Sequence, residues 1–182
     1  MIEGEALVLP PEAVGAAKEL LRVERPDEDG LIGALAAAAA EQCEGFTGRA
    51  LLARGFVETM PASRAWQRLG RTPVRAILAV EALPAEGPAQ PLASGAYAID
   101  IDARGDGWVR LTAPAEVRRI RVGYEAGIAA AWAGLPAALR HGILRLAAHL
   151  YTVRVAEGAR PSEPLPAAVA ALWRPHRRLR LR

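Results

Sequence analysis

The stretch LPAALRHGILRLAAHLYTV, residues 135–153, carries the clearest folding signal in this chain. Its large apolar residues follow one another at steps of three or four, and they are Leu135, Leu139, Ile143, Leu146, Leu150 and Val153. Such steps place side chains on one face of an α-helix. Pro136 suits the first turn of a helix, and the Gly and Pro residues that follow residue 157 would end it. We therefore expect a helix over residues 136–157 with this stripe buried.

Three further helices are expected, two before this one in the sequence and one after it. Residues 11–23 begin after a proline and carry apolar residues at helical spacing until Pro26. Residues 28–47 begin with acidic residues, which favour a helix N-terminus, and Gly48 is placed to end this helix. Its expected buried face consists of Leu31, Leu35, Ala38, Gln42 and Phe46. Residues 165–173 are expected to form a short fourth helix.

In the middle of the chain, the apolar residues no longer recur at helical spacing. Short segments with β-branched or aromatic residues alternate there with clusters of Pro and Gly, which is typical of strands joined by turns. These segments are residues 56–60, 74–83, 97–101, 108–112 and 117–124. In the last of them Ile120, Val122 and Tyr124 alternate with Arg119 and Arg121. We expect one side of this strand to be buried and the other to face solvent or a partner.

These segments together predict an α+β fold. It is expected to be mainly an α-helical bundle, with a small antiparallel β-unit inserted between helices two and three over residues 51–125. We expect a single domain over residues 1–173. Residues 174–182 are expected to form an extended, basic C-terminal tail.

The charge of the chain is unevenly distributed. The net charge is +3, yet the last nine residues hold five arginines and no acidic residue, so the first 173 residues have a net charge of −2. The alternation Leu179-Arg180-Leu181-Arg182 indicates one apolar edge. This tail could dock on protein, contact nucleic acid or remain solvated, and the alternation favours docking on protein.

Several classes of function find no support in the motifs. The N-terminus carries Glu3 and Glu5 where a signal peptide would carry bases, and no apolar run is long enough to cross a bilayer. We expect an intracellular product without a membrane partner. The single cysteine, Cys43, lies among small and apolar residues and is expected to be a buried thiol in a reducing compartment.

The sequence offers only weak support for a catalytic or metal-binding site. Asp100, Asp102 and Asp106 resemble a calcium loop, but Arg104 stands at the third ligand position and Leu111 at the place of the bidentate Glu. A polar hairpin turn is the simpler interpretation. His141 and His149 would lie two helical turns apart, too far to share one zinc ion. The common nucleotide-binding, hydrolase and metalloprotease motifs are absent from the sequence. We expect no catalytic residues, no metal site and no cofactor.

The order of these segments resembles the head-tail connector (adaptor) family of long-tailed phages, which also occurs in prophages and gene transfer agents. The similarity covers most of the chain and departs from the family pattern at residues 152–155. The residues that carry it are 17–23 (AKELLRV), 27–32 (DEDGLI), 46–51 (FTGRAL), 72–74 (TPV), 122–127 (VGYEAG), 135–140 (LPAALR) and 148–151 (AHLY).

The resemblance implies a structural protein and not an enzyme. Such a subunit forms a homo-oligomeric ring, twelve-fold like the portal, in the neck of a particle assembled in the bacterial cytoplasm. Its partners would be the portal protein, a stopper or tail-completion protein, and DNA that passes through the lumen without sequence-specific contacts. The alanines of residues 36–40 would allow close packing between subunits, or they only fill a helix.

We further expect the tail to be the element that docks on the portal. The residues in question are Trp173, Arg174, Arg177, Arg178, Leu179, Arg180, Leu181 and Arg182. A segment that orders only on docking loses its conformational entropy at that step. The alternative from another class is a small basic nucleic-acid-binding module, which the pI of about 9.6 and the arginine tail favour. An enzyme of unknown type is the third interpretation.

Overall fold

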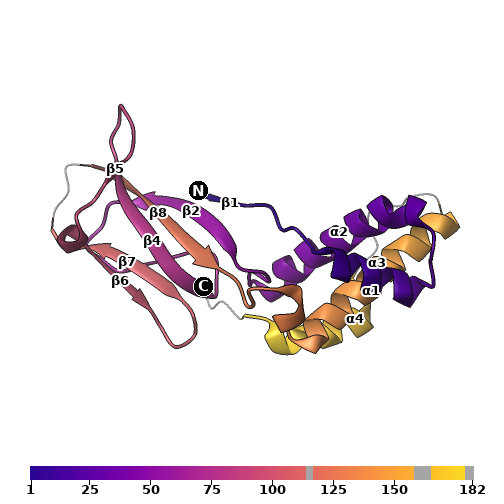
Figure 1. The fold of residues 1–182 in the computed structure, drawn as a ribbon. Helices are drawn as coiled ribbons and strands as arrows, with labels where there is room; N and C mark the ends of the chain where they lie inside the picture. Colours follow the sequence, from indigo (N-terminus) through magenta and orange to yellow (C-terminus); the bar gives the residue numbers. More distant parts are fainter. Residues whose placement is uncertain (114–116, 158–164, 179–182) are drawn as a thin grey trace. The chain divides into compact units, whose positions relative to one another are not determined.

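A computed structural model describes residues 1–113, 117–157 and 165–178 of the chain (Figure 1). The chain forms two compact units. The first, called the sheet unit, contains residues 1–6 and 52–128. The second, called the helical unit, contains residues 7–51 and 129–182. Each unit is therefore built from segments that are far apart in the sequence.

A five-stranded antiparallel sheet forms one layer of the sheet unit. Its strands lie in the order β1 (Ile2–Gly4), β2 (Arg54–Pro61), β8 (Arg119–Ala126), β4 (Val74–Leu83) and β5 (Gln90–Pro91). In the central strand β8, Ile120, Val122 and Tyr124 are fully buried while Arg119 is exposed. The predicted alternation of this strand is thus confirmed, and its arginines lie on the outer side of the sheet.

A three-stranded antiparallel sheet forms the other layer. Its strands lie in the order β3 (Gln67–Arg68), β7 (Gly107–Leu111) and β6 (Tyr97–Ile101). A Cβ added at Gly107 would lie 2.8 Å from side-chain atoms of Leu69 and of Val74. The inner side of β7 therefore packs against the inner side of β4, and Val109 and Leu111 are buried there. The two sheets form a sandwich, so their outer faces lie on opposite sides of this unit.

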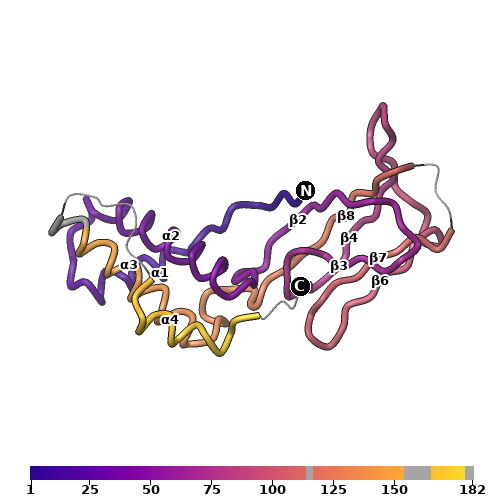
Figure 2. The backbone as a smooth tube through the Cα atoms, turned by 180° about the vertical axis from the view of Figure 1, so that it is seen from behind, coloured from indigo at the N-terminus to yellow at the C-terminus, as the bar shows by residue number. Residues whose placement is uncertain are grey.

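Four α-helices make up most of the described part of the helical unit. They are α1 (Pro11–Leu21), α2 (Asp29–Thr47), α3 (Ala137–Glu157) and α4 (Ala167–Trp173), with short 3-10 turns at Pro26–Glu28, Trp132–Gly134 and Arg174–His176. The backbone trace in Figure 2 shows α3 beside both α1 and α4, as the contacts between these helices require. Leu135, Leu139, Ile143 and Leu146 are buried, as their spacing predicted, whereas Leu150 and Val153 of the same stripe are half-buried.

The buried face of α2 differs from the predicted one. The fully buried apolar positions are Ile32, Ala36, Ala39, Ala40 and Cys43, whereas Leu31, Leu35 and Ala38 are half-buried and Gln42 is exposed. Alanine at the contact lets α2 and α3 approach closely, and the larger leucines then fit at the margins of the contact. The alanines at 36, 39 and 40 are therefore used inside this unit and are not available to a neighbouring subunit.

The predicted fold class was wrong in its proportions. Of the described residues, 40% are helical and 27% are in strands, so the fold is not mainly an α-helical bundle with a small β-unit. Strands of two or three residues, such as β1, β3 and β5, leave no periodic signal, and β1 lies outside the predicted insert. The tail also differs, because Arg174–His176 forms a 3-10 turn where an extended segment was predicted. Within the described ranges, no helix is both long and apolar enough to span a membrane.

Candidate interaction surfaces

The start of the predicted tail is anchored inside the helical unit. The side chain of Trp173 is fully buried, its indole nitrogen donates a hydrogen bond to the carbonyl of Leu139 over 3.4 Å, and its ring centroid lies 5.9 Å from that of Phe46. A Cβ at Gly142 would collide with the same indole nitrogen. The absence of a side chain at Gly142 therefore makes room for Trp173 against α3.

The next residues of the tail pack at the C-terminal end of α2. The backbone N–H of Arg178 donates to the carbonyl of Thr47 over 2.8 Å. The guanidinium of Arg177 lies 5.5 Å from the ring centroid of Phe46. Cations near the negative end of a helix dipole are favourable, and a cation over an aromatic ring adds to this. The sequence did not indicate this anchoring, because it joins residues about 130 positions apart.

The predicted docking residues are thus divided. Trp173 and Arg177 contact Phe46, Arg178 bonds to the neighbouring Thr47, and Arg174 begins the 3-10 turn between them. Leu179, Arg180, Leu181 and Arg182 lie outside the described residues. Docking of the tail on a portal stays a prediction.

The outer face of the five-stranded sheet carries a hollow. It has a volume of about 420 Å³ and is lined mostly by apolar atoms. The residues that line it include Glu3, Glu5, Gly55, Val57, Leu78 and Gly123. We call this site the outer-face hollow. Two glycines on neighbouring strands leave the space open, and the side chains of Val57 and Leu78 beside them are 39% and 69% exposed.

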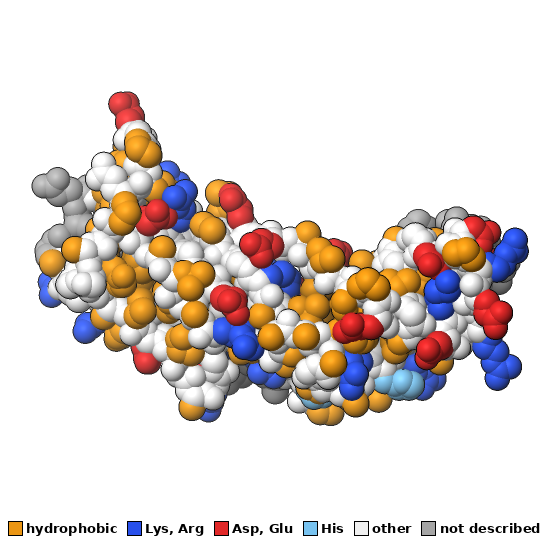
Figure 3. All heavy atoms as spheres, in the orientation of Figure 1, with side chains coloured by type: hydrophobic (Ala, Val, Ile, Leu, Met, Phe, Trp, Pro, Cys, Tyr) orange, Lys and Arg blue, Asp and Glu red, His pale blue; other side chains and the backbone are white. Residues whose placement is uncertain are grey.

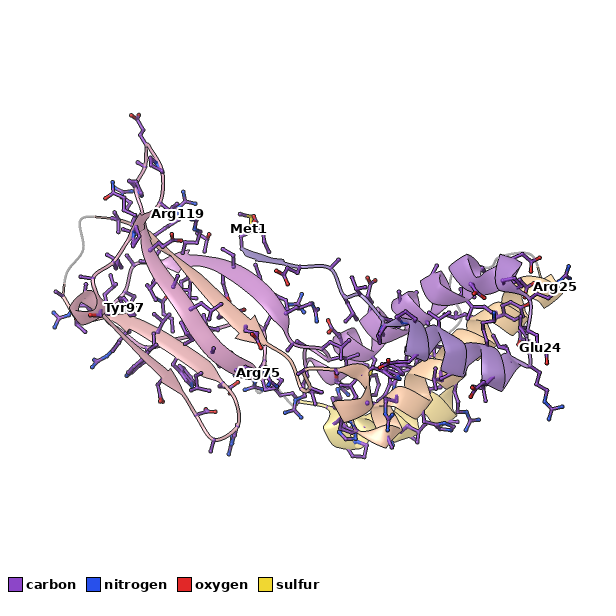
Figure 4. The ribbon with its side chains drawn as sticks, viewed as in Figure 1. Met1, Glu24, Arg25, Arg75, Tyr97 and Arg119 are labelled. Carbon is purple, nitrogen blue, oxygen red and sulfur yellow. The ribbon has the colours of Figure 1, made fainter. Side chains whose placement is uncertain are left out.

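Charged pairs flank the hollow on β4 and β8. Arg121 Nε lies 2.8 Å from an oxygen of Glu81, and Arg75 Nε lies 3.1 Å from an oxygen of Glu125. The hydrogen bond and the charge of Glu81 raise the pKa of Arg121 above its ordinary value. Figure 4 places Arg75 and Arg119 at opposite ends of the sheet, so both ends of this face carry a charged side chain.

The outer face of the three-stranded sheet carries an exposed tryptophan. Trp66 is 44% exposed, and the guanidinium of Arg110 lies 4.9 Å from its ring centroid. Arg64 and Arg68 are also exposed, and Arg68 lies 3.8 Å from a carboxylate oxygen of Asp106. We call Arg64, Trp66, Arg68 and Arg110 the Trp66 knob. No pattern in the sequence groups these four residues, because only the pairing of β3 with β7 brings Arg110 beside Trp66.

The other sequence candidates have structural roles. One carboxylate oxygen of Asp102 accepts hydrogen bonds from the backbone N–H groups of Arg104 and Asp106, each over 2.9 Å. This confirms the predicted hairpin turn, which joins β6 to β7. His141 is exposed on α3 and His149 is half-buried. Over the described parts of the chain, no three His, Cys, Asp or Glu residues are arranged to hold a metal ion.

Cys43 is buried in the helical unit, as predicted. Burial, followed by the charge of Glu44, raises the pKa of its thiol to about 12. A thiol of that pKa is almost entirely protonated near neutral pH, so it is a poor nucleophile and a poor metal ligand. Cys43 therefore acts as a small apolar residue of the core.

Comparison with known proteins identifies solved structures of gene transfer agent particles. No protein-family model matches the sequence, and no curated protein matches it. The neck of an empty gene transfer agent particle, computed with C6 symmetry, matches with a TM-score of 0.79 and 26% identity. The virion of a native gene transfer agent particle matches with a TM-score of 0.76 and 26% identity. The neck of a native particle computed with C12 symmetry gives 0.75 and 27%.

Each of these matches covers 100% of this chain and 97% of the other chain. The similarity therefore includes both units and is not limited to one common motif. It confirms the resemblance to head-tail connector proteins of phage-like particles that the order of segments indicated.

Proposed function

We propose that this chain is a structural subunit of the neck of a phage-like particle, where it forms a ring that connects the portal to the tail. The observation that carries this proposal is the match over the whole chain to neck subunits of gene transfer agent particles. A match of both units together supports a common architecture and a common place in the particle. The absence of catalytic motifs from the sequence agrees with a structural role.

The ring is proposed to contain twelve copies. A subunit that contacts its neighbours through two different surfaces makes a head-to-tail assembly, which closes when the rotation per subunit divides a full turn. Neck structures with C6 and C12 symmetry support this number. The portal protein would bind one end of the ring, a stopper or tail-completion protein the other, and DNA would pass through the lumen.

The C-terminal tail is the proposed portal-binding element. Its base is fixed in the helical unit by Trp173 and by the hydrogen bond from Arg178 to Thr47. The last four residues, 179–182, follow this fixed base in the sequence. Those residues alternate leucine with arginine, which suits a groove that is apolar on one side and acidic on the other.

The decisive experiment is reconstitution with the portal. The purified chain is mixed with the portal protein encoded in the same genomic region, and the product is imaged by electron microscopy beside the portal alone. We expect a ring of added density on the tail-side end of the portal. A chain that stays monomeric beside the portal and instead binds DNA in a salt-sensitive manner would contradict the proposal and favour the nucleic-acid-binding module.

A further inference from the structure

We propose that the ring is held together by the sheet unit, with the Trp66 knob of one copy inserted into the outer-face hollow of the next copy. This inference rests on the proposed function, since it assumes a ring of identical subunits. It identifies the two surfaces through which neighbouring copies in the ring contact each other. Both surfaces belong to the same compact unit.

The hollow exists because the middle of strand β8 has no side chain on its outer face. Gly123 lies in the middle of β8, and a Cβ added there would meet only the Ala79 side chain, at 3.8 Å. A central strand gains nothing from an outward glycine, because glycine weakens a strand and contributes no packing. The exposed side chains of Val57 and Leu78 border the same space, so this part of the sheet presents an apolar surface that lacks a cover.

The knob has the composition of an interface anchor. Tryptophan and arginine are enriched among the residues that contribute most to binding between proteins. Arg110 packs over the Trp66 ring and holds it in place, which reduces the entropy lost when the ring is buried. The Nε atom of Arg110 is buried and has no hydrogen-bond partner among the described residues. A Trp side chain buries about 150–250 Å² when covered, and the hollow of about 420 Å³ has room for it.

The charges of the two surfaces are complementary. Two carboxylates, Glu3 and Glu5, lie along the β1 side of the hollow. Arg121 pairs with Glu81 and lies close enough to Glu3 to feel its charge, while one carboxylate oxygen of Glu5 accepts a hydrogen bond from the backbone N–H of Gly55 over 3.1 Å. Arg54 donates to the backbone carbonyls of Glu5 and Leu52. The knob brings three arginines, and within the described part of the chain only Arg68 among them has a carboxylate partner. Opposite charges at the rim of an interface favour the correct register.

The placement of these surfaces favours a ring over a closed dimer. The inner sides of the two sheets pack against each other, so the hollow and the knob lie on opposite faces of the sandwich. Each copy can then offer its knob to one neighbour and its hollow to another. An interface between two different surfaces continues from copy to copy until it closes. In Figure 3, apolar side chains interrupted by charged ones cover the visible face of the sheet unit, a mixture typical of interfaces between subunits.

A cross-linking experiment tests this contact directly in the assembly. The chain has one lysine, Lys18, which pairs with Asp29. Arg64→Lys keeps the charge of the knob and adds a second side-chain amine. Copies labelled with ¹⁴N and ¹⁵N are mixed, assembled on the portal and treated with a carbodiimide, which joins amines to carboxylates in contact. We expect mixed-isotope peptides that join the new amine at position 64 to Glu3 or Glu5, and the Lys18–Asp29 link within one copy is the internal control.

The outcomes separate this inference from the proposed function. A ring on the portal with the internal link, but without links from position 64 to Glu3 or Glu5, would refute the knob-in-hollow contact and leave the neck function standing. If no ring forms on the portal, both proposals fail.

Two substitutions give an independent test. Gly123→Tyr should fill the hollow while favouring the strand, and Trp66→Ala should remove the anchor. Each variant alone should lose the ring and the cross-link, whereas a mixture of the two should give one-to-one pairs, because one intact knob and one intact hollow remain. Gly95→Tyr is the matched control, since a side chain at Gly95 meets nothing within 4 Å and lies outside both surfaces. Normal rings from Gly123→Tyr with a native circular dichroism spectrum would overturn the inference.

Discussion

At residue 142 of α3, a glycine occupies the middle of a helix because a larger residue would meet the indole of Trp173. Alanine there should improve helix propensity by about 1 kcal/mol, but overpacking against a buried ring typically costs about 1–3 kcal/mol. We therefore expect Gly142→Ala to lower the free energy of unfolding. Gly45→Ala on α2 is the control, because its Cβ would lie in open space, and it should raise that free energy. Urea unfolding of both variants measures the difference, and equal stabilisation would contradict this packing.

The buried thiol of Cys43 should make the stability of the chain depend on pH. Its pKa of about 12 in the folded chain lies above the value of about 8.5 for a free thiol. The unfolded chain therefore loses this proton at lower pH than the folded chain. The contribution of Cys43 to stability should be complete below pH 8.5 and should decline as the pH rises towards 12. A thiol reagent at pH 8 should react slowly with the native chain and rapidly in denaturant, and fast labelling of native protein would contradict burial.

Among the elements, the C-terminal tail combines an anchored base with an end that is proposed to bind the portal. Deleting residues 179–182 should leave the melting temperature unchanged, because Trp173 and the hydrogen bond from Arg178 to Thr47 remain. The same deletion should abolish binding to the portal. Trp173→Ala should instead cost about 3–5 kcal/mol of stability, as for other large buried aromatic residues. Unchanged portal binding after the deletion would refute the docking role of the tail.

The loop between β4 and β5 should exchange its amide hydrogens quickly. It projects away from the sheet in Figure 1, and residues 85–88 are exposed. Residues in such a loop have few buried contacts that would hold the backbone closed. The middle of β8, which pairs with β2 and β4 on both sides, should be strongly protected. Hydrogen exchange followed by mass spectrometry gives both rates, and equal protection in the loop and in β8 would contradict this expectation.

For the whole molecule, the distribution of charge distinguishes the two candidate functions. The net charge of +3 depends on the five arginines of the last nine residues. A nucleic-acid-binding module that contacts six to ten phosphates would lose affinity by about 10³–10⁵ between 50 and 200 mM salt. Binding to the portal through mixed apolar and charged contacts should weaken much less over this range. Titration of portal binding and DNA binding at both salt concentrations measures the two dependences.

Local patterns in the sequence were enough to find most of the regular elements. The three- and four-residue steps of residues 135–153 determined α3 and the buried face of its first half, and the two-residue alternation of β8 determined which of its sides is inside. These periods are properties of a single element, so neighbouring residues suffice to recognise them. The Cys43 thiol and the turn at Asp102 were recognised in the same way, from residue types close in the sequence.

Other features were decided only by the tertiary structure. The edge strand β1 pairs with β2 more than 50 residues later, α2 turns its alanines and not its leucines to the core, and Arg110 meets Trp66 through strand pairing. The outer-face hollow likewise exists because two glycines of distant segments, Gly55 and Gly123, lie on neighbouring strands. Each of these features depends on which distant segments pack together. The packing that occurs is the one with the lowest free energy for the whole chain, and a pattern within one short segment carries no information about it.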